Sequence, residues 1–169
     1  MKLVNKFISV ICATMLVSTY AMAGEAKVNW VDPDSYTDIE PGDEPRSRFE
    51  ARVFKELEEH IAKLAAKLPE GQTLTMDITN VDLAGDVRYM VGPNNATIRV
   101  IEDLYFPKMR FKYQLTDASG AKLSSGEEHI KDMGFFNSPG SGMHHENFKY
   151  EKVMLTDWFK ETFMRDTKQ

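Results

Sequence analysis

The stretch Lys108-Met109-Arg110-Phe111-Lys112-Tyr113-Gln114-Leu115-Thr116 alternates apolar and polar side chains from Met109 onward. A period of two residues is typical of a β-strand that lies with one face on a hydrophobic core and the other in solvent. Residues 117–120 (Asp-Ala-Ser-Gly) are turn formers, and a second run, residues 121–130, leads back. We therefore expect an antiparallel hairpin whose core-facing side chains are Met109, Phe111, Tyr113 and Leu115.

Two other segments have a helical period. Between residues 46 and 68 the apolar positions fall three or four apart, which predicts a helix with one buried face; they are Phe49, Val53, Leu57, Ile61, Leu64 and Leu68. Asp43 or Ser47 is a candidate cap for its start, and Pro69-Glu70-Gly71 ends it. Residues 148–163 predict a second helix, with apolar positions Val153, Leu155, Trp158, Phe159 and Phe163.

Further strands are expected at residues 27–31, 73–81 and 97–106, with brief pairing at 87–91. Strands gathered between helices predict an α+β fold, in which an antiparallel sheet of four to five strands carries two helices packed on one face. The opposite face of the sheet would carry Arg110, Lys112 and Gln114, and would be solvated or used for binding.

The first 23 residues predict a secretory signal peptide. Lys2 and Lys6 precede an apolar run at residues 7–20, and Ala21-Met22-Ala23 is a small-residue cleavage site. The run is shorter than the roughly 20 residues of a membrane-spanning helix. We therefore expect cleavage, no transmembrane anchor afterwards, and a single α+β domain at residues 24–169 in the periplasm or outside the cell.

Cleavage would remove the one cysteine, Cys12, and with it disulfides and thiolate metal ligands. It would also change the formal net charge from −5 to −7, since Lys2 and Lys6 are the only charged residues removed. An acidic chain argues against nucleic-acid binding and against electrostatic docking on anionic lipid. We expect no cofactor.

Several short motifs together resemble domain-of-unknown-function family 3016, which comprises exported proteins of Gram-negative bacteria. The motifs are VNWVDP at 28–33, YTDI at 36–39, LPEGQTL at 68–74, VDLAGD at 81–86, YFPKMR at 105–110, YQLTD at 113–117, YEK at 150–152 and DWF at 157–159. They extend over nearly all of residues 24–169. The resemblance implies a periplasmic location and a single domain; it implies no activity and no catalytic residues.

A glycine-rich segment near the C-terminus contains His144 and His145, followed by Glu146. Two imidazoles and a carboxylate are ligands for zinc or copper, with His129 as a possible third ring. Adjacent histidines rarely bind one metal ion through both rings, so a solvated polar loop is the favoured interpretation and a metal-binding protein the alternative.

Acidic and basic residues gather near the ends of the predicted strands: Asp82, Asp86, Arg88, Arg110 and Asp132. We interpret them as a polar cluster in which ion pairs order the loops. Hydrolysis by paired carboxylates is a further hypothesis. The sequence contains no nucleophile motif, and we predict no catalytic residues.

Phe135 and Phe136 follow the hairpin, and core burial is the favoured interpretation of the pair. If the two phenylalanines were exposed instead, they would form a contact surface together with Lys112 on the open sheet face. The favoured function is therefore a non-enzymatic binding or envelope-accessory protein, with an envelope protein as its partner.

Overall fold

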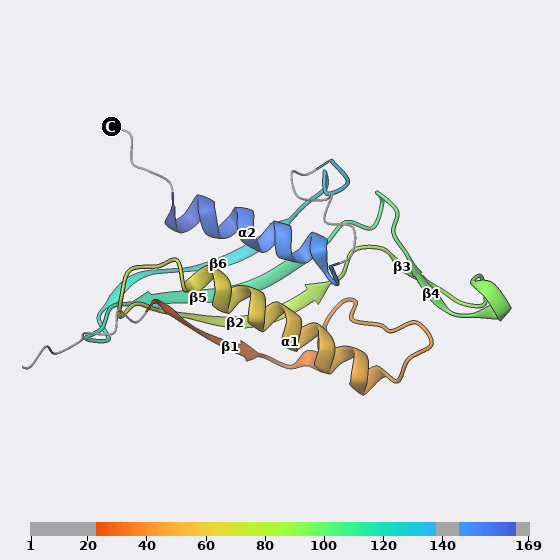
Figure 1. Ribbon diagram of the computed structural model, residues 1–169, viewed down its shortest axis with the longest axis horizontal. Helices are drawn as coiled ribbons and strands as arrows, with labels where there is room; N and C mark the ends of the chain where they lie inside the picture. The colour runs from red at the N-terminus through yellow and green to blue at the C-terminus, as the bar shows by residue number, and fades with distance from the viewer. Residues whose placement is uncertain (1–22, 138–145, 165–169) are drawn as a thin grey trace, which may run out of the picture.

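A computed structural model of the protein describes residues 23–137 and 146–164 (Figure 1). Four strands form the main sheet in the order β1-β2-β5-β6, and two short strands form a second sheet. The elements in chain order are β1 (Glu25–Trp30), the 3-10 turn η1 (Pro33–Ser35), α1 (Arg46–Ala65), β2 (Thr73–Asp82), β3 (Asp86–Arg88), the 3-10 turn η2 (Pro93–Asn95), β4 (Ile98–Val100), β5 (Lys108–Thr116), β6 (Lys122–Lys131) and α2 (Lys149–Phe163).

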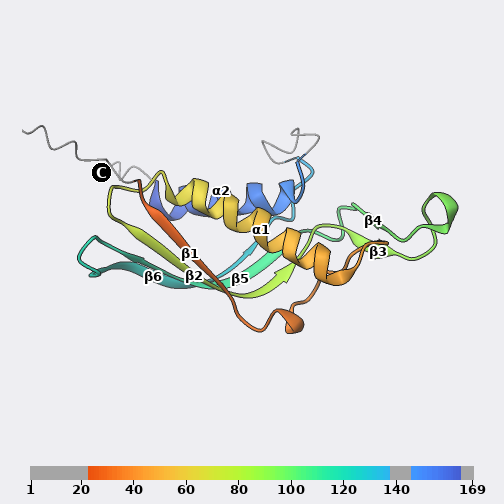
Figure 2. The same ribbon diagram turned by 60° about the horizontal axis from the view of Figure 1, so that its bottom comes forward.

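The α+β class is confirmed, and both helices cover the same face of the main sheet (Figure 2). The expectation of a purely antiparallel sheet is wrong, because β1 pairs with β2 in parallel, with Val28 opposite Met76. A parallel pair needs a crossover connection, and α1 supplies it between the two strands. The main sheet is therefore mixed, with antiparallel pairing from β2 onward.

The hairpin predicted from the alternating stretch is confirmed as β5 and β6. Met109, Phe111, Tyr113 and Leu115 are buried, whereas the side chains between them are exposed. In the turn, the Asp117 carboxylate accepts hydrogen bonds from the backbone N–H groups of residues 119 and 121, at 2.9 and 3.0 Å. The turn chemistry thus sets the register that places every second side chain on the core.

Strand β2 contains an irregularity that keeps the apolar residues on both sides of it in the core. Its register with β5 shifts between Ile78 and Asn80, so that Thr79 is the extra residue of a β-bulge. Ile78 and Val81 are both fully buried as a result, although they are three positions apart. Without the bulge, strict alternation would turn Val81 to the open face of the sheet.

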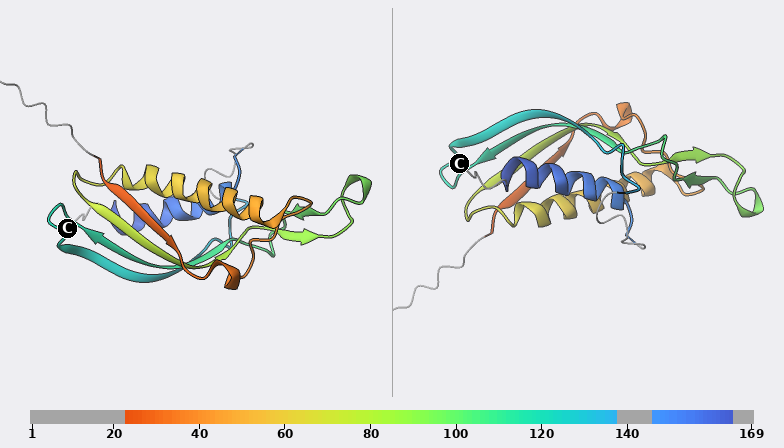
Figure 3. Two further views of the ribbon diagram at one scale, coloured as in Figure 1. Left: turned by 90° about the horizontal axis from the view of Figure 1, so that it is seen from below. Right: turned by 90° about the horizontal axis from the view of Figure 1, so that it is seen from above.

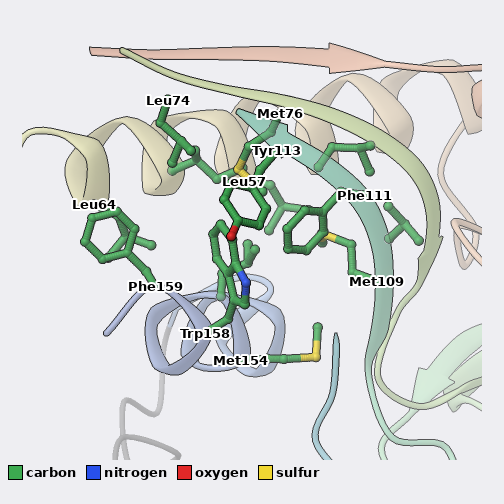
Figure 4. Close-up of a cluster of buried hydrophobic side chains, with 14 of the residues drawn as sticks. Leu57, Leu64, Leu74, Met76, Met109, Phe111, Tyr113, Met154, Trp158 and Phe159 are labelled. Atoms are coloured by element: carbon green, nitrogen blue, oxygen red, sulfur yellow. The ribbon is translucent and has the colours of Figure 1, made fainter. Parts of the chain in front are cut away.

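The core lies between the sheet and the two helices (Figure 4). The predicted stripe of α1 is buried from Phe49 to Leu64, and Leu68 follows it into the core. In α2, Trp158 packs edge-on against Phe111 and Tyr113, with ring centroids 4.7 and 5.4 Å apart. Aromatic contacts therefore join α2 to β5 of the hairpin.

The expected cap of α1 is not formed. Pro45 is the N-cap residue and makes no side-chain capping bond, while the Asp43 carboxylate instead accepts a hydrogen bond from the Thr97 N–H at 2.9 Å. The strand predicted at residues 97–106 is also much shorter, because β4 ends at Val100 and the Tyr105 N–H bonds to the Glu102 carbonyl in a turn. Strand β4 pairs only with β3, outside the main sheet.

Candidate functional site

Residues 86–100 form an arm that extends away from the helices and the main sheet (Figures 1 and 3). Strands β3 and β4 pair antiparallel along it, with Arg88 opposite Ile98. Gly85 precedes the arm with φ +85°, and a Cβ atom there would lie 2.5 Å from the Val100 carbonyl oxygen. Only glycine permits this backbone conformation and this close approach, so the direction of the arm is set at its first bend.

The end of the arm, residues 89–98, is called the tip. Its chain reverses around η2, where the Gly92 N–H bonds to the Ala96 carbonyl at 2.9 Å and the Ala96 N–H bonds to the Pro93 carbonyl at 3.1 Å. Met90 has φ 58°, a left-handed conformation that is uncommon for a long apolar side chain. The tip therefore has a defined backbone geometry, held by its own hydrogen bonds and by the bond from the Thr97 N–H to the Asp43 carboxylate.

An ion pair attaches the arm to the segment between β1 and α1. The Arg99 guanidinium donates two parallel hydrogen bonds to the Asp38 carboxylate, at 2.7 and 2.8 Å, and a third to the Glu40 carbonyl at 2.9 Å. The two charged side chains are 16% and 21% exposed. A bidentate, mostly buried pair of this kind restricts the angle between the arm and the sheet.

The tip exposes large apolar side chains and carries no charge. Tyr89, Met90 and Val91 are 65%, 72% and 60% exposed, and no Asp, Glu, Lys or Arg occurs from residue 89 to 98. Contiguous exposed apolar surface on a folded chain marks an interaction site more often than chance exposure. These side chains are the strongest docking feature among the described residues.

A cavity of about 230 Å³ lies where the arm joins the helices, and we call it the base cavity. Its apolar wall comes from segments far apart in the sequence, and its lining residues are Leu83, Ala84, Arg99, Ile101, Glu146, Phe148, Lys149, Tyr150 and Glu151. Residues 83 and 84 directly precede Gly85, the bend before β3, and residue 101 directly follows β4. The cavity is therefore built into the root of the arm.

Two buried charged residues lie side by side at the start of α2. Glu151 is 2% exposed, and one carboxylate oxygen accepts a hydrogen bond from the Ala84 N–H at 2.7 Å. Burial raises the pKa of the Glu151 carboxyl, against the opposing effect of that bond. Lys152 is 5% exposed, and its ammonium group contacts the carboxylates of Glu56 and Glu146 at 2.7 and 2.9 Å.

The residues of the predicted polar cluster take part in separate contacts. Asp82 pairs with Lys108 at 2.6 Å, while Asp86 and Arg88 pair with each other at 2.8 Å on β3. Arg88 also contacts Glu102 at 3.0 Å.

Arg110 lies on the open sheet face, in register with His129 of β6. The Asp132 carboxylate accepts a hydrogen bond from the Gly134 N–H at 3.0 Å, beyond the end of β6. The structure thus brings Asp86 and Arg88 together and leaves Arg110 on another surface.

The two phenylalanines after the hairpin have different environments. Phe135 is 1% exposed and packs edge-on against Tyr150 at 4.6 Å, whereas Phe136 is 43% exposed and stacks on Phe135 at 4.5 Å. Lys112 is exposed on the open sheet face, in register with Asp77 of β2 and Glu127 of β6. Lys112 thus faces away from the helices, whereas Phe135 packs against Tyr150 of α2.

The predicted metal ligands are only partly described. His144 and His145 lie outside the described residues, and His129 is exposed on β6. In residues 23–137 and 146–164, no three side chains of His, Cys, Asp or Glu are grouped so that they could hold a metal ion. Within the same ranges, neither helix is long and apolar enough to cross a bilayer.

The sequence did not indicate the exposed tip or the base cavity. Residues 87–91 suggested only brief pairing, and the available signal was an uncharged run at 89–98 that surrounds a Gly-Pro-Asn-Asn turn. Glu151 and Lys152 belong to one of the family motifs, but nothing in the sequence indicated that they are buried, because charged residues on a helix are usually solvated.

Comparison with curated proteins and with solved structures yields no match. A family profile, in contrast, matches residues 24–161, which confirms the resemblance drawn from the short motifs. The profile's description is "Protein of unknown function (DUF3016)". Since the match extends over most of the sequence, the chain belongs to this family.

Proposed function

We propose that this protein is exported to the periplasm and acts there without catalysis, as a binding or envelope-accessory protein that docks through the tip of its arm. The single observation that carries the docking role is the exposure of Tyr89, Met90 and Val91 on an uncharged, ordered projection. Export is supported by the leader-like sequence of residues 1–23 and by the family match, which begins at residue 24.

The exposed tip offers enough apolar surface to stabilise a complex. Complete burial of a side chain of this size contributes about 1.5–3 kcal/mol. Tyr89, Met90 and Val91 are each more than half exposed, so a partner that covered them would gain roughly 3–6 kcal/mol in total before the costs of association. Because Arg99 and Asp38 hold the arm at its base, the arm would lose little conformational freedom on binding, and most of this gain would remain.

Photo-crosslinking in cells tests the docking role. A photoreactive amino acid replaces Met90 in the full-length chain, and a matched control replaces Leu123, which is 50% exposed on β6. We expect a discrete adduct from position 90 and none from position 123. Equal labelling at both positions, or no adduct at position 90, would refute docking through the tip.

The same cultures test export. We expect the protein in the periplasmic fraction with an N-terminus at Gly24, measured by intact mass. A cytoplasmic protein that retains residues 1–23 would overturn the location independently of the crosslinking result.

A further inference from the structure

We propose that the tip docks on a second copy of this chain, with two arms side by side and antiparallel about a two-fold axis, and with Met90 of each copy in the base cavity of the other. This inference rests on the proposed docking role of the tip and specifies its partner.

Each chain carries both halves of the contact. Met90 is 72% exposed, the largest exposure recorded for any apolar side chain of the tip, and its side chain is unbranched and adaptable. The base cavity, at about 230 Å³, has apolar walls that include Leu83, Ile101 and Phe148. A flexible thioether side chain suits an irregular apolar cavity of this size.

The positions of the tip and the cavity fit a two-fold arrangement. The tip is at the far end of the arm (Figure 1). The base cavity is at its root, because Leu83 and Ile101, on either side of the arm in the sequence, line it. When two arms lie antiparallel, each tip reaches the root of the other arm, so one rotation forms both contacts together. Such an isologous interface is closed and stops at the dimer.

The size of the contact also favours a second copy. A stable interface uses about 20–30 residues from each side. The tip alone has ten residues, too few to form such an interface. In the reciprocal arrangement each chain contributes its ten tip residues and the six cavity-lining residues that are at least partly exposed, so the contact is larger than the tip alone provides; the six are Arg99, Ile101, Glu146, Phe148, Lys149 and Tyr150.

Charge does not oppose the contact at the arms. The tip is uncharged, Arg88 is paired with Asp86 and Glu102, and Arg99 is paired with Asp38. The rest of the chain is acidic, with a formal net charge of −5 for the full sequence. Repulsion between the two copies is therefore long-range, and salt should screen it and strengthen the dimer.

Sedimentation and light scattering of the exported, purified protein give the first test. We expect a concentration-dependent dimer whose dissociation constant falls as the salt concentration is raised. Met90→Asp should weaken it by more than about 100-fold, because the substitution acts at both symmetric contacts. Leu123→Asp is the matched control and should leave the dimer intact. A native protein that stays monomeric at high concentration, or an unaffected Met90→Asp dimer, would overturn the inference.

Disulfide trapping tests the geometry of the dimer. In a Cys12→Ser background no other cysteine is present, so Met90→Cys and Ile101→Cys are the only thiols. The β3–β4 ladder ends at the Arg88–Ile98 pair on the tip side and at the Asp86–Val100 pair on the root side, so positions 90 and 101 of one chain lie beyond opposite ends of it and are more than about 7 Å apart, the length of two strand residues. A disulfide joins Cα atoms within about 7 Å, so a bond between these positions must join two chains.

We expect a disulfide-linked dimer from the double variant and from a mixture of the two single variants, and none from either single variant alone. A linked dimer from Met90→Cys alone would indicate tip-to-tip contact and would overturn the antiparallel arrangement. A monomer that still forms an adduct with a different protein at position 90 would overturn this inference while the proposed docking function stands.

Discussion

Replacement of Lys152 by methionine tests whether the buried ammonium group holds α2 against α1. Its side chain is 6% exposed and contacts the carboxylates of Glu56 and Glu146 at 2.7 and 2.9 Å. Burial alone would lower the pKa of Lys152, but its bonds to the two glutamates outweigh burial and raise it. Lys152→Met keeps most of the apolar stem and removes only the charge and its hydrogen bonds.

The expected loss is about 1–2 kcal/mol of unfolding free energy at pH 7. A hydrogen bond between charged groups contributes about 1.5–3 kcal/mol. The glutamates are 26% and 38% exposed, however, so water replaces part of each lost contact and reduces the cost to about 0.5–1 kcal/mol per bond. In a domain of this size the loss corresponds to a fall in Tm of roughly 2–8 °C.

The loss should depend on pH with a defined sign. The hydrogen bond from Lys152 lowers the pKa of Glu56 below its value in the unfolded chain. The contact therefore stabilises the fold above the ordinary carboxyl pKa, and this contribution disappears as the pH falls through the lowered pKa. Native protein and Lys152→Met should consequently converge in stability as the pH is reduced from 7 into the acid range.

Urea unfolding followed by circular dichroism measures both effects, with Lys67→Met as a control because Lys67 is exposed in the turn that follows α1. Equal stability of native protein and Lys152→Met at pH 7 would refute the stabilising role of the contact. A loss of the same size at every pH would show that the contact does not depend on the ionised carboxylate of Glu56.

Four further substitutions are predicted to change stability in defined ways. Burial lowers the pKa of His60, so the native protein loses stability as the pH falls through that lowered pKa, and His60→Gln should lose less between pH 7 and pH 5 in urea titrations. Burial raises the pKa of Glu151, so its stabilising contribution is lost as the pH rises through the raised pKa. Glu151→Gln should be more stable than native protein at pH 8 and similar at pH 4, as thermal melts would show. Gly126→Ala would place a Cβ atom 2.8 Å from the Tyr113 ring and should cost about 1–3 kcal/mol, whereas Gly134→Ala, with 3.8 Å to its nearest neighbour, should cost much less.

Local periodicity was sufficient to predict the helices and the central hairpin. The spacing of Phe49 to Leu64 and the alternation of Met109 to Leu115 each depend on residues close in the sequence, and the structure confirms both. The parallel pairing of β1 was missed, because the direction of a strand in a sheet depends on how the connecting helix returns the chain. The order strand, helix, strand was visible in the sequence and was compatible with a parallel pair.

The candidate site was far less predictable. Phe135 and Phe136 are adjacent in sequence, yet one is buried against Tyr150 and the other is 43% exposed. Asp43 was one of two candidate helix caps, the other being Ser47, but its partner is Thr97 on the arm, 54 positions later in the chain. Such contacts join residues whose separation in sequence carries no information about their separation in space.

The sequence by itself determined the two helices and the central hairpin, which of their faces are apolar, and which family the chain belongs to, because periodicity and motifs are properties of neighbouring residues. Only the tertiary structure decided that residues 86–100 leave the main sheet as an arm, and that Glu151 and Lys152 are buried. Whether a side chain is buried, and whether a segment extends away from the sheet, depends on which segments from elsewhere in the sequence pack against it. Ala84 and Glu56, far from α2 in the sequence, supply the partners of these two charges. Within the described chain, Tyr89, Met90 and Val91 at the tip stay more than half exposed.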